Sequence, residues 1–298
     1  MTDIRGSVLE CVGQTPLIRL RRVFRKEGVD LLAKHEGFNP GGSVKERIAV
    51  AMLEGSERAG LLRRGMTVVE SSSGNTGVGL AMAAAVKGYA CLITMSTKAS
   101  VERRQLIRAF GAQLVLVEGG SDEAWDRADA IAAGDPAKFF RIHQYRMAAN
   151  VDVHFRTTGP EIWEQTGGKV DVLVATLGTT GTIVGCSRFL RQKNPRIRIV
   201  SVEPAPTNEQ EGIRNLASQR VPPIWDPAAV DERRVCEDEP AYRLARELAR
   251  KEGIFAGTSS GSALWAAIEE SKRLDRGTVV LILPDNGYKY LSTRLFQC

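Results

Sequence analysis

One lysine of this sequence stands where a neutral amine would be favoured. Lys45 follows the turn at residues 39–42, and Ser43 and Glu46 have the S-x-x-E spacing of a capping box, which predicts a helix from Ser43. Lys45 then falls in the first helical turn, where the positive end of the helix dipole disfavours a charged ammonium group. A neutral lysine amine can form an imine with a carbonyl compound. The alternative is a solvated lysine on a capped helix.

Three further polar turns each precede a predicted helix, at residues 70–77, 178–182 and 257–262. Hydroxyl groups and free N–H groups at a helix N-terminus favour anions. The first turn suits a carboxylate, and its Asn75 can also hydrogen-bond a phenolic or carbonyl oxygen. The second turn predicts a phosphate cradle, although it lacks both G-x-G-x-x-G and the Walker A pattern. Taken singly, each turn is also compatible with an ordinary capped helix start.

These turns lie between short β-branched runs and helical segments. Such alternation is typical of a parallel-sheet α/β protein. In such sheets, polar turns meet at the carboxyl ends of the strands. The stretch 204–238 carries five prolines and predicts a long irregular region. The strands are predicted at 16–20, 29–35, 67–70, 89–95, 113–117, 138–143, 170–177, 197–203 and 278–283, and the helices at 43–59, 76–87, 100–110, 182–192 and 240–252.

Composition excludes several classes of protein. The 298 residues are 43% hydrophobic and 26% charged, and the net charge of +6 is spread along the chain, which argues against nucleic-acid binding. No apolar run has the roughly 20 residues of a membrane span, and the N-terminus has no signal-peptide pattern. We therefore expect a cytoplasmic protein. The five cysteines form no C-x-x-C pair and the three histidines are dispersed, so no metal site is predicted.

The chain resembles the cysteine synthases, which are fold-type II pyridoxal-phosphate enzymes. The resemblance runs almost end to end through motifs that occur in the family's order. The motifs lie at residues 13–17, 39–45, 73–77, 102–104, 157–162, 178–182, 253–261 and 283–287. Residues 157–163, 178–182 and 211–214 are most similar to the B-type O-acetylserine sulfhydrylases and their phosphoserine-using relatives.

This resemblance implies an α/β fold of the tryptophan synthase β type, with two doubly wound sheet domains and helices on both faces. It implies a smaller mobile domain at 38–150 and a larger cofactor-binding domain at 1–37 and 151–298. Lys45 is expected to hold pyridoxal 5'-phosphate as a Schiff base and to act as the general base. The other expected cofactor-binding residues are Asn75, Gly178, Thr179, Thr180, Gly181, Thr182 and Ser259. The expected substrate-binding residues are Ser72, Ser73, Gly74, Thr76, Gln144 and Arg214.

The implied reaction is β-replacement on an O-activated L-serine, either O-acetylserine or O-phosphoserine. Sulfide or thiosulfate would add to an aminoacrylate intermediate to give cysteine or S-sulfocysteine. Ser259, a neutral group facing the pyridine nitrogen, would favour elimination over transamination. Arg214 could meet a substrate phosphate bidentately. The resemblance also implies a homodimer, with a serine acetyltransferase as a candidate partner.

Several positions depart from the family on the substrate side. Tyr145-Arg146-Met147-Ala148 replaces the usual segment with Asn-Pro, Val151 stands where proline is common, and Ser96 also replaces a proline. These departures leave the donor and the nucleophile open. The alternative is a 2,3-diaminopropionate synthase-like enzyme that uses O-phosphoserine and an amine donor. A serine/threonine dehydratase and a non-catalytic partner-binding protein are further rivals; retention of Lys45, Asn75 and Gln144 argues against the latter.

Overall fold

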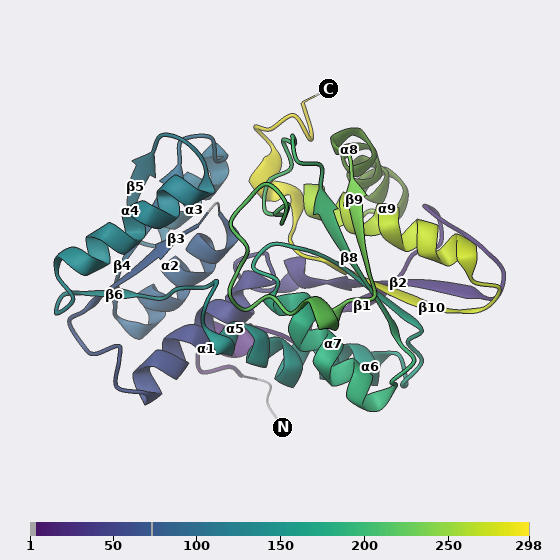
Figure 1. Cartoon of the computed structure of the whole chain (residues 1–298), viewed down its shortest axis with the longest axis horizontal. Helices are drawn as coiled ribbons and strands as arrows, with labels where there is room; N and C mark the ends of the chain where they lie inside the picture. The colour runs from purple at the N-terminus through teal and green to yellow at the C-terminus, as the bar shows by residue number, and fades with distance from the viewer. Residues whose placement is uncertain (1–3, 73, 298) are drawn as a thin grey trace.

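Two sheets flanked by helices make up the molecule (Figure 1). The structure is a computed structural model and describes residues 4–72 and 74–297. Strand order is β1-β2-β10-β7-β8-β9 in the six-stranded sheet and β5-β4-β3-β6 in the four-stranded sheet. The strands are β1 (Leu17–Arg19), β2 (Val29–His35), β3 (Thr67–Ser71), β4 (Ala90–Ser96), β5 (Gln113–Val117), β6 (Phe139–Arg141), β7 (Val172–Thr176), β8 (Arg198–Pro204), β9 (Glu232–Cys236) and β10 (Gly277–Leu283).

Helices cover both faces of each sheet, which confirms the predicted α/β class. All strand pairs are parallel except β1 with β2, so one antiparallel edge strand modifies the expected parallel pattern. The α-helices are α1 (Lys45–Arg58), α2 (Asn75–Lys87), α3 (Val101–Ala109), α4 (Ser121–Gly134), α5 (Ala148–Val153), α6 (Gly159–Gln165), α7 (Gly181–Lys193), α8 (Asp238–Glu247) and α9 (Thr258–Arg273).

The six-stranded sheet separates two hydrophobic clusters because successive side chains of a strand point to opposite faces. Val172 and Val174 of β7 pack with residues of α8 and α9 on one face. Leu173 and Ala175 of the same strand pack with residues of α6 and α7 on the other face. The central strands are therefore apolar on both faces, as strands of parallel sheets usually are.

Two glycines in the left-handed conformation directly follow the ends of the predicted helices 76–87 and 240–252. Gly88, with φ 75°, follows α2, and Gly253, with φ 71°, follows the π-helical segment Leu248–Glu252 that continues α8. Glycine adopts this conformation without the steric penalty of a side chain. Among the described residues, no helix is both long and apolar enough to cross a membrane.

Two local predictions were wrong. Helix α1 begins at Lys45 and not at Ser43, because Ser43 forms an isolated β-bridge with Asp285. The stretch 204–238 is not irregular throughout, since Glu232–Cys236 forms β9 beside β8. This edge strand is mostly polar, so it lacks the apolar run by which the other strands were found. The domain boundaries at 37/38 and 150/151, and motion of the smaller domain, stay predictions.

Candidate active site

A cavity of about 860 Å³ opens where strands of both sheets end. Its lining includes residues at the carboxyl ends of strands β3, β4, β7 and β10, and the first residues of helices α1, α2 and α9. The free N–H groups of a helix start attract negative charge. The fold therefore directs several such starts at one cavity. The lining residues that the sequence predicted are Lys45, Ser72, Asn75, Thr76, Gln144, Gly178, Thr179, Arg214 and Ser259.

The Lys45 amine has an unusual acidity for a lysine. Its pKa is lowered to about 8, mainly by burial; the nearby charge of Lys289 acts in the same direction, whereas Asp285 and Glu46 oppose it. The direction agrees with the prediction of a favoured neutral amine. The main physical cause is burial rather than the helix dipole on which the sequence argument rested. The neutral, nucleophilic form of Lys45 is thus far more populated near neutral pH than that of an ordinary lysine.

Glu46, the next residue of α1, is a buried acid beside this lysine. Its carboxylate accepts hydrogen bonds from the Ser43 N–H at 2.8 Å and from the Ser43 hydroxyl at 2.9 Å, and the Ser43 oxygen accepts the Lys45 N–H at 3.1 Å. The predicted capping interaction therefore exists, although the helix begins two residues later. Burial raises the pKa of Glu46 to about 7, opposed by the Lys289 charge.

The turn between β3 and α2 presents hydrogen-bond donors to the cavity. The Ser72 hydroxyl oxygen accepts the N–H groups of Gly74 at 3.1 Å and Gly77 at 2.9 Å, so its own proton remains free to donate. The Thr76 hydroxyl donates to Gln144 at 2.7 Å, and Gln144 donates one amide hydrogen to the Ser71 carbonyl at 2.7 Å. This brings Ser72, Thr76 and Gln144 together as predicted. Ser73 lies outside the described residues.

Asn75 is held by a buried carboxylate that the sequence reasoning did not single out. Its amide donates to Asp285 Oδ2 at 2.7 Å, and the Tyr290 hydroxyl donates to the same oxygen at 2.7 Å. The second amide hydrogen of Asn75 stays available, and its Oδ1 has no hydrogen-bond partner. Asp285 thus fixes the Asn75 side chain, which keeps one amide hydrogen and its oxygen for further hydrogen bonds.

Only part of the predicted phosphate turn, residues 178–182, lines the cavity. Gly178 and Thr179 line the cavity, whereas residues 180–182 do not. Thr180 has φ 72°, a strained conformation for a threonine, and its buried hydroxyl has no hydrogen-bond partner. Strain and an unpaired hydroxyl at the start of α7 are both expected of a turn shaped for a ligand.

His154 connects this turn to a π-helical segment, His154–Thr158. One ring nitrogen lies 3.1 Å from the Thr182 hydroxyl and the other 2.9 Å from the Thr158 hydroxyl. Burial holds the pKa of His154 well below its usual value, and the charges of Arg47 and Lys45 act in the same direction. The imidazole is therefore neutral and orients Thr182. π-Helical turns often occur at functional sites, but no sequence signal marked this one.

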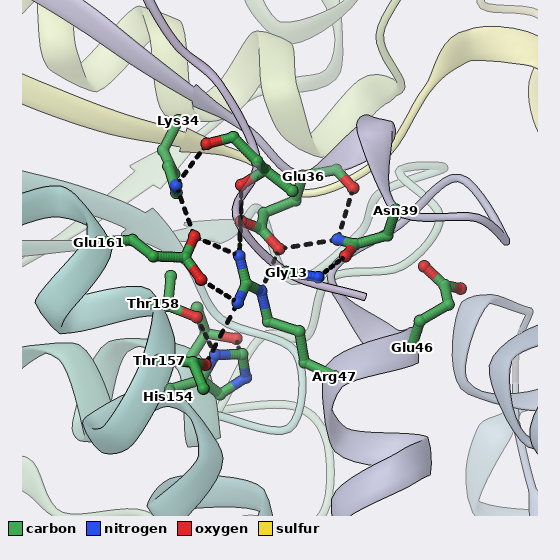
Figure 2. A network of polar contacts seen from close by, with 12 residues as sticks. Gly13, Lys34, Glu36, Asn39, Glu46, Arg47, His154, Thr157, Thr158 and Glu161 are labelled. Carbon is green, nitrogen blue, oxygen red and sulfur yellow. Dashed lines mark hydrogen bonds and ion pairs between the residues drawn. The ribbon is translucent and has the colours of Figure 1, made fainter. Parts of the chain in front are cut away.

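A buried ion-pair network around Arg47, two residues after Lys45, joins distant segments of the chain (Figure 2). Arg47 of α1 binds both oxygens of Glu36, at 2.7 and 2.9 Å, and both oxygens of Glu161, at 2.7 Å each. Lys34 of β2 donates to the Thr15 carbonyl at 2.6 Å and pairs with Glu161 at 2.6 Å. The network fixes the first turns of α1 against the six-stranded sheet, and hence the position of Lys45.

The remaining predicted residues have contrasting surroundings. Ser259, in the first turn of α9, lines the cavity and is buried, next to Ser260, whose hydroxyl has no hydrogen-bond partner. Gly181 packs against Asn150, where a Cβ would lie 2.0 Å from the amide oxygen. Arg214 is buried and pairs with Asp122 at 3.2 Å. Its expected contact with a substrate phosphate stays a prediction.

The donor set fits pyridoxal phosphate. A lysine of lowered pKa and an asparagine with a spare amide hydrogen line one cavity. The helix start expected to hold the phosphate has an unpaired hydroxyl, that of Thr180, next to the lining residues Gly178 and Thr179. Ser259 is a neutral partner of the type expected for the ring nitrogen. Within residues 4–72 and 74–297, no group of three or more His, Cys, Asp or Glu side chains could hold a metal ion.

Known proteins resemble the chain in sequence and in fold. The family model for pyridoxal-phosphate dependent enzymes matches residues 8–285. Cysteine synthase B of Pseudomonas aeruginosa is 41% identical over 100% of the chain and 99% of its own length. The crystal structure of O-ureido-L-serine synthase has a TM-score of 0.93 at 37% identity, covering 98% of this chain and 95% of that one. Cysteine synthase of Entamoeba histolytica has a TM-score of 0.94 at 35% identity, covering 99% and 91%.

Proposed function

The chain belongs to the cysteine synthase family of pyridoxal-phosphate dependent enzymes, and we propose that it replaces the activated hydroxyl of an O-activated L-serine with sulfide to give cysteine. One observation carries this proposal: Lys45, with a pKa of about 8, shares one cavity with the starts of α1, α2 and α9 and the turn before α7. The cysteine synthase relatives supply the reaction class.

Four groups of residues would hold the cofactor. Lys45 would bind its carbonyl carbon, Asn75 its ring oxygen through the spare amide hydrogen, and Ser259 its ring nitrogen. The turn at 178–182 would hold its phosphate, with Thr182 oriented by His154. The bound cofactor supplies an electron sink that makes the α-proton of an amino acid acidic.

The chain's own residues would then bind the substrate and move its proton. The free Ser72 proton, the second amide hydrogen of Gln144 and the first N–H groups of α2 suit the α-carboxylate. Gly74 and Thr76 belong to the same turn, and Ser73 stays a predicted substrate-binding residue. The Lys45 Nζ would take the α-proton, the Cβ–O bond would break, and a Cβ–S bond to the nucleophile would form. Lys45 would finally return a proton to Cα.

A turnover assay with a lysine variant tests this proposal. The purified holoenzyme should show a visible cofactor band and form cysteine from sulfide with O-acetylserine or O-phosphoserine. Thiosulfate and an amine donor serve as additional nucleophiles, which cover S-sulfocysteine and 2,3-diaminopropionate formation. Lys45→Ala should abolish both the band and turnover, whereas the exposed Lys251→Ala should change neither. A normal band and normal turnover in Lys45→Ala would refute the proposal.

A homodimer in the cytoplasm, with a serine acetyltransferase as partner, completes the proposed function. The family resemblance supports these assignments. Sedimentation velocity of the purified protein, alone and mixed with a serine acetyltransferase, tests the assembly, since a monomer at all concentrations would contradict it.

A further inference from the structure

Arg214 lines the same cavity as Lys45. Its backbone N–H donates to the Leu177 carbonyl at 2.7 Å, immediately before the turn at Gly178, and its side chain lines the cavity with those of Ser121 and Tyr145. Only 4% of the residue is exposed. A leaving group carried by the substrate would thus approach a cation that solvent screens weakly.

Both terminal nitrogens of this cation already have hydrogen-bond acceptors. Arg214 Nη1 donates to Asp122 Oδ1 at 3.2 Å and to the Arg220 carbonyl at 2.9 Å. Nη2 lies 3.3 Å from the Ser121 hydroxyl and 3.4 Å from the Tyr145 hydroxyl. An anion that sought the usual bidentate contact with the guanidinium would have to displace these partners, Asp122 first.

A stack of side chains holds the guanidinium in this place. Its carbon atom lies 5.0 Å from the centroid of the Tyr145 ring, and that ring stacks on Trp125 with 4.5 Å between centroids and 8° between planes. Arg220 lies 5.0 Å from the Trp125 ring and pairs with Asp126 of α4 at 3.1 Å. Because Trp125 is only 1% exposed, the stack is anchored in the packed interior and limits rotation of Arg214.

We propose that Asp122 is a specificity-determining residue, which pairs with Arg214 and so withholds this cation from a negatively charged leaving group. The inference rests on the proposed β-replacement and selects between its donors. A phosphate ester would meet a neutralised arginine and the Asp122 carboxylate, a like charge that disfavours it. An uncharged acyl ester has no such conflict. The unmodified enzyme therefore discriminates against O-phosphoserine relative to O-acetylserine.

Asp122→Asn tests the inference, because asparagine keeps the shape and the acceptor oxygen but removes the charge. The affinity of the holoenzyme for each donor is measured without nucleophile, from the change that the donor causes in the cofactor absorption. Turnover with sulfide then gives kcat/KM for each donor. We expect the phosphoserine-to-acetylserine ratio to rise about tenfold or more in both measurements, a tenfold change being about 1.4 kcal/mol.

Two further variants identify the cause. Asp126→Asn, a matched change one turn along α4 in an exposed carboxylate that pairs with Arg220, should leave the ratio as it is. In Asp122→Asn combined with Arg214→Gln, the phosphoserine-to-acetylserine ratio should not rise, because the double variant has no arginine that the loss of Asp122 could free. An unchanged ratio in Asp122→Asn, or a preference of the unmodified enzyme for O-phosphoserine, would overturn the inference. If the variant changed the binding ratio of the two donors but the holoenzyme formed no cysteine, only the proposed function would be refuted.

Discussion

Replacement of Arg47 by leucine removes the centre of the buried ion-pair network. Arg47 is 2% exposed and binds two carboxylates, of which Glu36 is fully buried. Breaking a buried pair by removing one partner typically costs about 3–5 kcal/mol, since the other charge is left uncompensated. Lys34 still pairs with Glu161, so Glu36 is the carboxylate that loses most of its charge compensation. We expect Arg47→Leu to lower the free energy of unfolding by about 3–5 kcal/mol near neutral pH.

The same variant should reverse the pH dependence that Glu36 contributes. Burial alone would raise the pKa of Glu36, but Arg47, Thr15 and Lys34 hold it below its usual value. In the unmodified protein this carboxylate therefore adds stability above its unfolded pKa, and the stability is lost as the pH falls. Without Arg47, burial dominates and the folded pKa rises. The variant should then recover part of its deficit as the pH falls from neutral toward the unfolded pKa of the Glu36 carboxyl group.

Urea unfolding followed by circular dichroism measures both effects. Arg58→Leu is the matched control, because Arg58 is exposed and its closest approach to Glu54 is 3.9 Å. Surface pairs of this kind contribute little, so its unfolding free energy should stay within about 0.5 kcal/mol of the parent. A loss below about 1 kcal/mol in Arg47→Leu, with the pH profile of the parent, would refute the assignment of Arg47 as the centre of a cooperative network.

Two further predictions concern the lysine and the helix packing. The cofactor-free protein should take up pyridoxal phosphate faster as the pH rises, with the half-maximal rate at about pH 8, because only the neutral amine of Lys45 reacts. Stopped-flow absorbance measures this rate. A rate that still climbs steeply at about pH 10, where ordinary lysines titrate, would contradict the lowered pKa. Gly261→Ala should destabilise the protein by several kcal/mol, on the order of the costs seen for overpacked cores, because its Cβ would lie 1.9 Å from the Ala241 carbonyl oxygen where α9 crosses α8. Gly134→Ala, with no atom within 4 Å of its Cβ, is the control in the same thermal unfolding measurement.

Strands with apolar runs were predictable from the sequence, and polar elements were not. The predicted strands 29–35 and 113–117 have the bounds of β2 and β5. Strand β9 was missed because Glu232, Arg233 and Arg234 give it no apolar run at the sheet edge. The start of α1 was misplaced because a cap spacing cannot reveal that Ser43 also bridges to Asp285, a residue far along the chain.

The candidate site shows the same division. Turns that hold anions have a local signature of glycine and hydroxyl residues, so the cavity-lining residues of these turns, such as Ser72, Thr179 and Ser259, were predicted. The supporting groups have none, since His154, Asp285 and Glu161 are common polar residues that tertiary contacts alone bring to the site. One signal was present: Lys34 and Glu36 flank His35 at the end of an apolar strand, where unpaired charges would be costly.

The order of strands in the two sheets has a consequence for synthesis of the chain. The four strands of one sheet come from the continuous stretch 67–141, so this sheet can assemble as soon as that stretch has left the ribosome. The other sheet places β2 between β1 and β10, and β10 ends fifteen residues before the C-terminus. One edge of β2, made among the first forty residues, therefore has no partner strand until residues 277–283 of β10 have been made. Chaperones that cover newly made strands should matter most for this early segment.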